Sequence, residues 1–441
     1  MADGVEERLI SAISTPAGTG GVAIIRVSGA GAKALAGKMF APAGKTRVED
    51  FEPNRMYAGK ILCGEFDDFG MCVYFKAPKS FTGEDVVEFH CHGGVQIARG
   101  VLKATFECGA RAAERGEFTK RAFVNGKLSL SSAEGMIDMI NAGSLAEVRA
   151  GRLLYGEKLT DEVKEIQSYL TDTLAQIAAD TDYPEEGIEE TELSSVGADL
   201  TRVCERLNAL VKAYAGGKLI KHGVSVAICG APNVGKSSLL NALLGYDKAI
   251  VSPVAGTTRD GVEGAIEIDG VRYNLTDTAG IRESADEIEN VGIGRAKSAL
   301  SSADAVLCVS DTGDFSAADG VEEARLIRVF SKTDKSAPRG SYDVAVSAVA
   351  GEGLEELKRL LSERATGGSL EHAYVIEERH YRALKEAREK LLSAIEGIGM
   401  FPLDVISLDI REGWRVLGEI TGETADEEII DRVFAKFCVG K

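Results

Sequence analysis

The stretch Gly230-Ala-Pro-Asn-Val-Gly-Lys-Ser237 decides the fold of the central part of the chain. It has the form GxxxxGK[ST], and it directly follows the apolar run Val224–Cys229, which predicts a buried strand. Glycines let a backbone wrap around phosphates, and successive N–H groups at a helix N-terminus bind anions. We therefore expect a strand, a loop and a helix, with Lys236 on the β- and γ-phosphates of a nucleotide and the Ser237 hydroxyl on Mg²⁺.

The sequence around this motif predicts an α/β fold. Further apolar runs follow at Ala305–Ser310, Leu326–Phe330 and Val344–Val346, with helical segments between them. Asp269-Gly270, flanked by two apolar runs, is a strong signal for a two-residue hairpin. Residues 222–365 are therefore expected to form a doubly wound sheet that carries one antiparallel hairpin.

Two further segments point to a nucleotide triphosphate. Asp277-Thr-Ala-Gly280 lies at the end of a predicted strand, where the carboxylate would reach Mg²⁺ through water. The Gly280 N–H would approach the γ-phosphate. Between this segment and the phosphate loop lies Gly256-Thr-Thr-Arg-Asp260, in which a threonine hydroxyl would complete the magnesium shell only while the γ-phosphate is present.

The base is predicted from Ser331-Lys-Thr-Asp334, which resembles the guanine-reading element NKxD. The Asp334 carboxylate would accept hydrogen bonds from the N1–H and the 2-amino group of guanine, which adenine cannot supply. Ser331 stands where the pattern has Asn, and its hydroxyl could still bond to N7. A backbone N–H of Ser347-Ala348 would meet O6. The pattern favours GTP over ATP.

Hydrolysis requires a group that positions water. The residue after the DTAG segment, Ile281, is apolar and cannot do so. We take Glu289, acting through a bridging water, as the candidate. The alternative is that Glu289 is an ordinary exposed acid on a helix.

Composition excludes several classes of protein. The 441 residues are 44% hydrophobic and 27% charged, which excludes a disordered chain. The net charge of −18 argues against gripping nucleic acid alone, because phosphate binding relies on Lys and Arg. The eight cysteines form no CxxC pair, so reduced thiols are expected. With no apolar run long enough for a bilayer and no signal-peptide pattern, we expect a cytoplasmic protein without membrane contact.

The flanking regions predict two further domains. Residues 1–127 read as mixed α/β, with a strand at Val22–Val27. Residues 128–221 and 366–441 read as helical, so the simplest division is one helical domain interrupted by the inserted domain 222–365. One apolar helix face comprises Leu159, Val163, Ile166, Leu170, Leu174 and Ile177. Thr424 and Glu427 predict a capping box for the last helix.

Several blocks resemble one known family over the whole chain. They are STPAGTGGVAIIRVSG, SFTGEDVVEFHCHGG, GEFTKRAFVNGKLSLSSAEG, GTTRD, DTAGIRE and the C-terminal FCVGK. In combination they are similar to the bacterial tRNA-modification GTPases called MnmE or TrmE. The resemblance implies an N-terminal folate-binding and dimerisation domain at 1–127, a discontinuous helical domain, and an inserted P-loop G domain.

The resemblance also implies an activity and its partners. A K⁺-stimulated GTPase would act as a homodimer, with the flavoprotein MnmG (GidA) in a heterotetramer or larger complex. Together they would place an aminomethyl or carboxymethylaminomethyl group on C5 of the wobble uridine, position 34 of tRNA. The one-carbon donor would be a tetrahydrofolate derivative, 5-formyl or 5,10-methylene. FAD and NADH would enter only through the partner, and tRNA mainly through the complex.

The family motifs assign residues to roles. The folate would contact Arg26, Glu88, Lys127 and Lys441, although without the resemblance a surface salt bridge would be the simpler interpretation. The K⁺ ligands would be Asn233, Ser252, Val254 and Thr257, and the Mg²⁺ ligands Ser237 and Thr258. Glu289, Lys236 and Cys438 would be catalytic, the role of the Cys438 thiol being open between function and packing. The residues implied at the nucleotide are Asn233, Val234, Gly235, Lys236, Ser237, Ser238, Ser252, Pro253, Val254, Ala255, Gly256, Thr257, Thr258, Asp277, Thr278, Ala279, Gly280, Ser331, Lys332, Asp334, Ser347 and Ala348.

Two alternatives remain open at this point. A regulatory GTPase of the ribosome-assembly type would share the G domain, although such proteins usually carry a basic extension that is missing here. A folate carrier with an incidental GTPase domain is the other. A metal site at His90-Cys91-His92 is not expected, because alternation along a strand puts Cys91 on the face opposite the two histidines.

Overall fold

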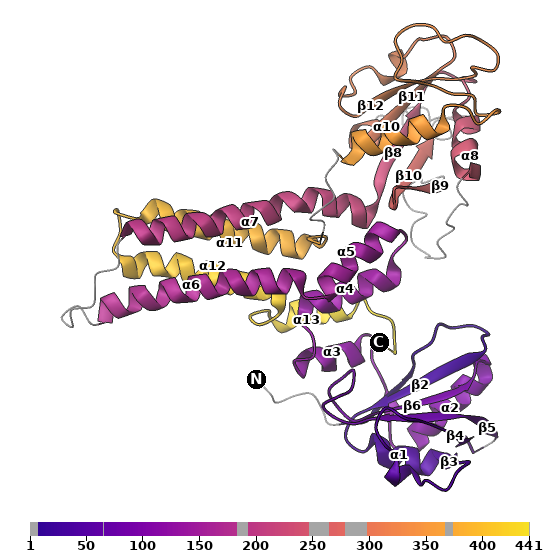
Figure 1. The fold of residues 1–441 in the computed structure, drawn as a ribbon, viewed down its shortest axis with the longest axis vertical. Coiled ribbons are helices and arrows are strands. Elements are labelled where there is room, and N and C mark those ends of the chain that lie inside the picture. The colour runs from indigo at the N-terminus through magenta and orange to yellow at the C-terminus, as the bar shows by residue number, and fades with distance from the viewer. Residues whose placement is uncertain are drawn as a thin grey trace, which may run out of the picture. The chain divides into compact units, whose positions relative to one another are not determined.

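The computed structural model describes residues 8–64, 66–182, 193–246, 264–277, 298–366 and 374–440. The chain divides into two compact units, Met1–Ile137 with Gly418–Lys441, and Asp138–Leu417. The elements carry the labels of Figure 1. The domain boundaries at 127, 221 and 365 stay predictions, since these units group residues differently.

The first unit is built on a seven-stranded sheet with the strand order β3-β4-β5-β6-β2-β1-β7. Its strands are β1 (Ile10–Ile13), β2 (Val22–Ser28), β3 (Phe40–Pro42), β4 (Met56–Leu62), β5 (Asp67–Phe75), β6 (Val86–His92) and β7 (Arg111–Ala112). Its helices include α1 (Ala32–Met39), α2 (Val95–Glu107) and α3 (Glu117–Val124), and α4 (Leu130–Asn141) begins in it. Helices α1 and α2 pack against the sheet, and apolar side chains of helices and strands form one core there.

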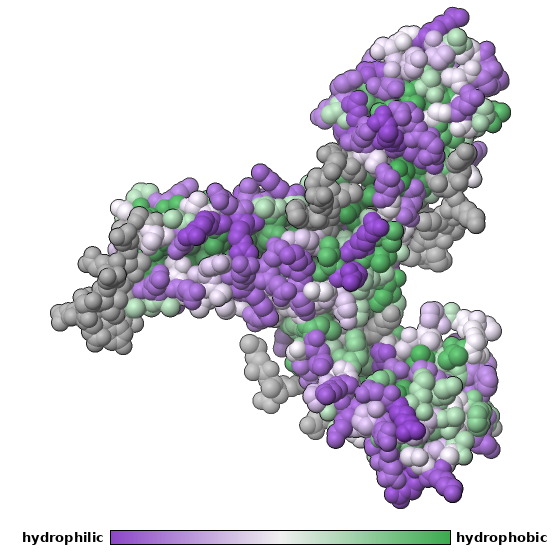
Figure 2. Space-filling model, viewed as in Figure 1, coloured by the Kyte–Doolittle hydropathy of each residue, from purple (hydrophilic) through white to green (hydrophobic). Residues whose placement is uncertain are grey.

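The pleat of this sheet places different chemistry on its two faces. Cys72 and Phe89 point into the core, whereas neighbouring strand positions carry exposed Met56, Phe69 and Met71. Figure 2 shows hydrophobic residues, in green, at the surface of this unit. The sheet face opposite this core also carries Arg26 of β2 directly opposite Glu88 of β6.

The second unit contains a six-stranded sheet with the order β13-β12-β11-β8-β10-β9. Its strands are β8 (Val224–Cys229), β9 (Gly264–Ile268), β10 (Val271–Asp277), β11 (Ala305–Ser310), β12 (Leu326–Phe330) and β13 (Val344–Ala345). All pair in parallel except β9 and β10, which form the predicted antiparallel hairpin. Helices α8 (Lys236–Tyr246) and α10 (Leu354–Thr366) belong to the same region. The doubly wound α/β fold with an added helical part is therefore confirmed.

Long helices precede and follow this sheet in the chain. They are α5 (Leu145–Tyr155), α6 (Lys158–Asp182), α7 (Leu193–His222), α11 (Glu378–Gly397) and α12 (Leu403–Thr421). Helix α7 packs along α11, although the sheet lies between them in sequence (Figure 1). The predicted apolar face of α6 is buried except for Leu174, which is half-buried. Burial of that face is what holds such long helices together in water.

The predicted capping box of the last helix is wrong. Helix α13 (Glu427–Phe434) begins two residues later than a Thr424 cap requires, and the Asp426 carboxylate accepts the Ile429 N–H at 2.8 Å. Thr424 instead donates its backbone N–H to Gly418 O at the end of α12. It therefore belongs to the turn that ends the preceding helix.

None of the helices in the described ranges combines the length and the apolar composition that a membrane crossing requires.

Candidate functional site

The phosphate loop joins β8 to α8, as the motif predicts. Gly230 and Gly235 adopt φ values of 144° and 101°, and Asn233 lies in the left-handed region at 61°. A Cβ on Gly230 would come within 2.2 Å of Val309 O on β11, so only glycine fits there. Strand packing therefore fixes where the loop leaves the sheet.

The residues predicted to hold phosphate and magnesium lie together at this loop. Lys236 is buried, and its Nζ donates to Gly230 O at 3.1 Å and to Ala231 O at 2.8 Å. Ser237 Oγ donates to Asp277 Oδ2 at 3.3 Å, across from α8 to the end of β10. A hydroxyl and a carboxylate form an oxygen set of the kind that Mg²⁺ prefers, so these two residues fit that ion.

The two predicted base-reading segments, 331–334 and 347–348, contact each other. Ser347 Oγ donates to Asp334 Oδ1 at 2.8 Å, which brings the two segments together, and Ala348 is half-buried next to Ser347. Lys332 Nζ donates to Asn233 O at 2.7 Å. The Ser331 hydroxyl donates to Val234 O at 2.6 Å. Both bonds tie the base-reading segment to the phosphate loop.

Sequence reasoning missed Asp311, whose Oδ2 lies 2.6 Å from Lys332 Nζ. Asp311 directly follows the buried parallel strand β11, and an acid at the end of such a strand is the same sequence signal that predicted Asp277. Such residues gather at the carboxyl edge of a doubly wound sheet. The remaining described residues of the predicted nucleotide set, Val234, Gly235 and Ser238, lie in the loop and in α8, with Ser238 exposed.

Several predicted positions lie outside the described residues. They are Ser252, Pro253, Val254, Ala255, Gly256, Thr257, Thr258, Thr278, Ala279, Gly280, Glu289 and Lys441.

In the first unit, Arg26 and Glu88 bond to each other. Arg26 Nε donates to Glu88 Oε1 at 2.8 Å, and His90 Nε2 lies 3.3 Å from Glu88 Oε2. Burial alone would raise the pKa of the Glu88 carboxyl, but its contact with His90 and the charge of Arg26 outweigh that effect and hold the pKa below its usual value. The carboxylate thus stays charged at neutral pH although it is largely buried.

A loop between β5 and β6 connects Arg26 with the third predicted folate residue. The Arg26 guanidinium lies 5.5 Å from the centre of the Phe81 ring. Lys127 Nζ donates to Pro78 O at 3.0 Å, and Asn125 Nδ2 donates to Thr82 O at 2.7 Å. Arg26 and Lys127 therefore lie against the same short loop.

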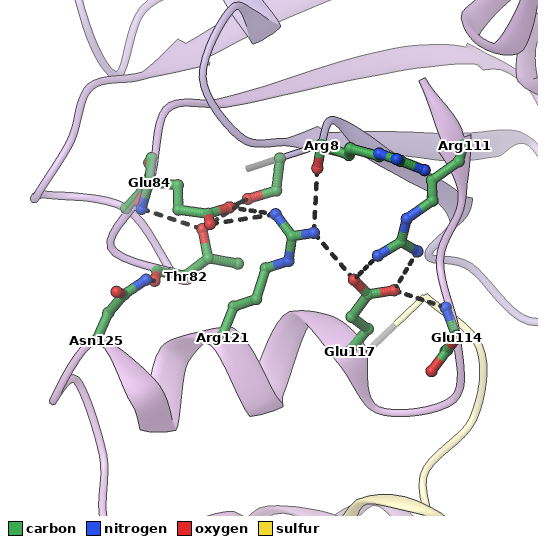
Figure 3. A network of polar contacts seen from close by, with 10 residues as sticks. Arg8, Thr82, Glu84, Arg111, Glu114, Glu117, Arg121 and Asn125 are labelled. Atoms are coloured by element: carbon green, nitrogen blue, oxygen red, sulfur yellow. Dashed lines mark hydrogen bonds and ion pairs between the residues drawn. The ribbon is translucent and has the colours of Figure 1, made fainter. Parts of the chain in front are cut away.

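A buried arginine holds this loop in place (Figure 3). Arg121 of α3 is 2% exposed and donates to both Glu84 oxygens, at 3.1 and 3.0 Å. It also donates to Glu117 Oε1 at 2.9 Å and to Arg8 O at 3.1 Å. The segment KRAFVNGK predicts a role for Lys127 only, and the structural role of Arg121 follows from its burial in the folded chain.

The C-terminal FCVG segment, itself part of the first unit, bonds to the N-terminal part of that unit. Gly116 N donates to Cys438 O, and Ser14 Oγ donates to Gly440 O at 3.1 Å. A Cβ on Gly440 would come within 2.2 Å of Ile13 O, so the last described glycine packs directly on the end of β1. The Cys438 side chain is exposed, whereas seven other thiols are buried or half-buried. An exposed thiol does not suit the interpretation of Cys438 as a buried packing residue, and its functional role stays a prediction.

Comparisons with known proteins give consistent results. A family model described as the MnmE helical domain matches residues 130–438, and one described as the GTP-binding protein TrmE N-terminus matches residues 9–127. A tRNA modification GTPase MnmE of Moorella thermoacetica is 40% identical, covering 98% of this chain and 99% of the relative. One of Natranaerobius thermophilus is 37% identical, covering 99% and 100%. The crystal structure of the G domain of the T. maritima FeoB iron transporter is 31% identical and covers 32% of this chain and 98% of that one; its TM-score of 0.25 supports no argument.

Proposed function

Since the chain belongs to the MnmE family of tRNA modification GTPases, we propose that it couples GTP hydrolysis to a change at C5 of the wobble uridine, position 34 of tRNA. The observation that carries the nucleotide part is the Ser237–Asp277 contact at the phosphate loop, with Asp334 and Ser347 paired on the base side. The product would carry an aminomethyl or carboxymethylaminomethyl group.

In our proposal, different residues bind the phosphates, the magnesium ion and the base of the nucleotide. Lys236 neutralises phosphate charge, and its present bonds to loop carbonyls can be exchanged for phosphate oxygens. Ser237, Thr258 and Asp277 would hold Mg²⁺, which would supply positive charge against the phosphates. Asp334 reads guanine, with its carboxylate oriented by Ser347.

Hydrolysis without an added activator is the next part of the proposal. Glu289 orients the attacking water, because Ile281 cannot. Asn233, Ser252, Val254 and Thr257 would hold a K⁺ ion, which would supply positive charge to the site. Asn233 has a left-handed backbone, which asparagine adopts more readily than most residues, so its residue type suits this position of the loop.

The K⁺ proposal predicts that GTP turnover by the purified chain is faster in KCl than in NaCl at equal ionic strength. The Asn233→Ala variant should lose most of this difference while still binding GDP. Equal rates in both salts for the parent chain would contradict the K⁺ site.

The first unit is proposed to bind a tetrahydrofolate derivative, 5-formyl or 5,10-methylene, as the one-carbon donor. Glu88, charged at neutral pH, suits the 2-amino and N3 edge of a pterin, and Arg26, Lys127 and Lys441 suit the acidic tail. Binding would exchange the Arg26–Glu88 bond for bonds to the ligand. The exposed Cys438 thiol is proposed to lie at the modification site.

The proposed partners follow from the family and from the surface. The exposed apolar residues Met56, Phe69 and Met71 support pairing of the first unit with a second copy. The flavoprotein MnmG would supply FAD and NADH in a heterotetramer or larger complex, which would carry most of the tRNA contact in the cytoplasm. Because tRNA phosphates bind Lys and Arg, the net charge of −18 supports a tRNA-binding surface that this chain shares with its partner.

Deletion of the chain tests the whole proposal. Nucleoside mass spectrometry of tRNA from the deletion strain should show loss of the C5 substituent of uridine 34, and a plasmid copy should restore it. A Lys236→Ala copy should fail to restore it, whereas a copy changed at the exposed Arg47 should succeed. Unchanged uridine 34 in the deletion strain would refute the proposal. Recovery of a flavoprotein on the tagged chain would support the partner assignment.

A further inference from the structure

Position 331 differs chemically from the guanine-reading pattern that surrounds it. In that pattern an asparagine begins the segment, and its side-chain amide carries two N–H donors. A serine hydroxyl carries one donor and two acceptor lone pairs. An asparagine can therefore donate to two acceptors at once, whereas Ser331 must use its single proton on one.

The structure shows where that proton goes. Ser331 Oγ donates to Val234 O of the phosphate loop at 2.6 Å. Ser331 is 4% exposed and Val234 is 5% exposed, so water does not compete freely for this bond. Guanine N7 is an acceptor without a proton, and it can bond only to a donor. With its proton on Val234 O, the Ser331 hydroxyl has nothing to give to N7.

Rotation of the hydroxyl toward N7 would be unfavourable. It would leave the buried Val234 carbonyl without this partner, and leaving a buried acceptor unpaired costs more than one new neutral hydrogen bond contributes. Rotation would also release the base-reading segment from the phosphate loop. The bond to Val234 thus takes precedence over any bond to the base.

The rest of the base-reading segment does not depend on Ser331. Ser347 Oγ, in a fully buried side chain, orients the Asp334 carboxylate from the next loop. Lys332 is held by Asn233 O and by Asp311. The carboxylate that accepts from N1–H and the 2-amino group is therefore positioned independently of N7.

We propose that this chain reads guanine through Asp334 and makes no hydrogen bond from residue 331 to N7. The inference rests on the proposed guanine nucleotide site and specifies its ligand class: purine nucleotides with the N1–H and 2-amino edge of guanine, whatever stands at position 7. The proposal differs from the expectation that the Ser331 hydroxyl could still bond to N7.

Calorimetric titration of the full-length chain, with Mg²⁺ present, tests the proposal with GDP, 7-deaza-GDP and ADP. In 7-deaza-GDP a C–H replaces N7, so no hydrogen bond can form there. The parent chain should bind 7-deaza-GDP within about twofold of GDP, or more tightly, and should bind ADP far more weakly. The Ser331→Asn variant restores a second donor and should prefer GDP over 7-deaza-GDP by about fivefold.

The outcomes separate this inference from the function on which it rests. A parent chain that selects GDP over ADP but rejects 7-deaza-GDP by fivefold or more would overturn this inference alone. Equal binding of GDP and ADP would overturn the guanine site and the inference together. The Ser331→Ala variant, which has no donor, should keep the parent ratio of GDP to 7-deaza-GDP. It supplies a second comparison should Ser331→Asn not fold, and a changed ratio would count against the proposal.

Discussion

Replacing Asp311 tests how the base-reading segment is held against the phosphate loop. Lys332 Nζ lies 2.6 Å from Asp311 Oδ2 and 2.7 Å from Asn233 O, so one ammonium group bridges β11 and the loop. Lys332 itself has a φ of 58°, a conformation that non-glycine residues adopt only when their contacts hold them. Asp311→Ala removes one of these contacts.

The size of the effect follows from exposure. The Lys332 and Asp311 side chains are 31% and 27% exposed. Hydrogen bonds to charged groups contribute about 1.5–3 kcal/mol when buried, whereas exposed ion pairs contribute roughly 0–1 kcal/mol. We expect about 1 kcal/mol for this intermediate case, which corresponds to about fivefold weaker GDP binding. Most of the loss should appear as faster release.

Stopped-flow displacement of a fluorescent GDP analogue measures this release rate directly. The matched control is Asp319→Ala, which removes the same charge from an exposed position in the same region. Release from the control should stay within experimental error of the parent chain. If Asp311→Ala also releases GDP at the parent rate, Lys332 is positioned without Asp311, and our account of this bridge is wrong.

Three further variants test other contacts. Asp334→Asn should weaken GTP binding by about a hundredfold and leave ATP binding unchanged. One carboxylate oxygen becomes an N–H donor that faces guanine donors, and the other loses its charge; competition binding measures both affinities. Arg121→Met removes the charged partner of Glu84 and leaves Glu117 paired with Arg111 alone. It should destabilise the first unit by about 3–5 kcal/mol, seen as melting roughly 10 °C lower, whereas the exposed Arg47→Met should melt like the parent. Burial opposes ionisation of Glu117, but its bonds with Arg111 and Arg121 hold its pKa below the usual value of 4.5. The charged Glu117 carboxylate therefore contributes stability above about pH 4.5, and this contribution is lost as the pH falls through the lowered folded-state pKa. The difference in the free energy of unfolding between the parent and Glu117→Gln, measured by urea unfolding, should shrink below about pH 4.5. A gap that widened on acidification would contradict this sign.

Short sequence patterns were sufficient to predict the elements that form the sheet of the second unit. The apolar run before Gly230, the hairpin signal at Asp269-Gly270 and the phosphate loop each depend on a few consecutive residues. Strand burial, turn geometry and helix N-termini constrain residue type at short range, which is why such patterns can be read from the sequence. The cap of α13 shows the limit: Thr424 and Asp426 are both suitable residues, and the turn that ends α12 decides between them.

The sequence by itself therefore determined the P-loop fold and the candidate residues for phosphate, magnesium and guanine. Only the tertiary structure decided what those residues bond to. Ser331 and Val234 are 97 positions apart, and Ser14 and Gly440 are 426 apart. Their meeting depends on the order in which strands join the sheets and on where the C-terminus packs, because hydrogen bonds between distant segments require the whole fold to bring donor and acceptor together.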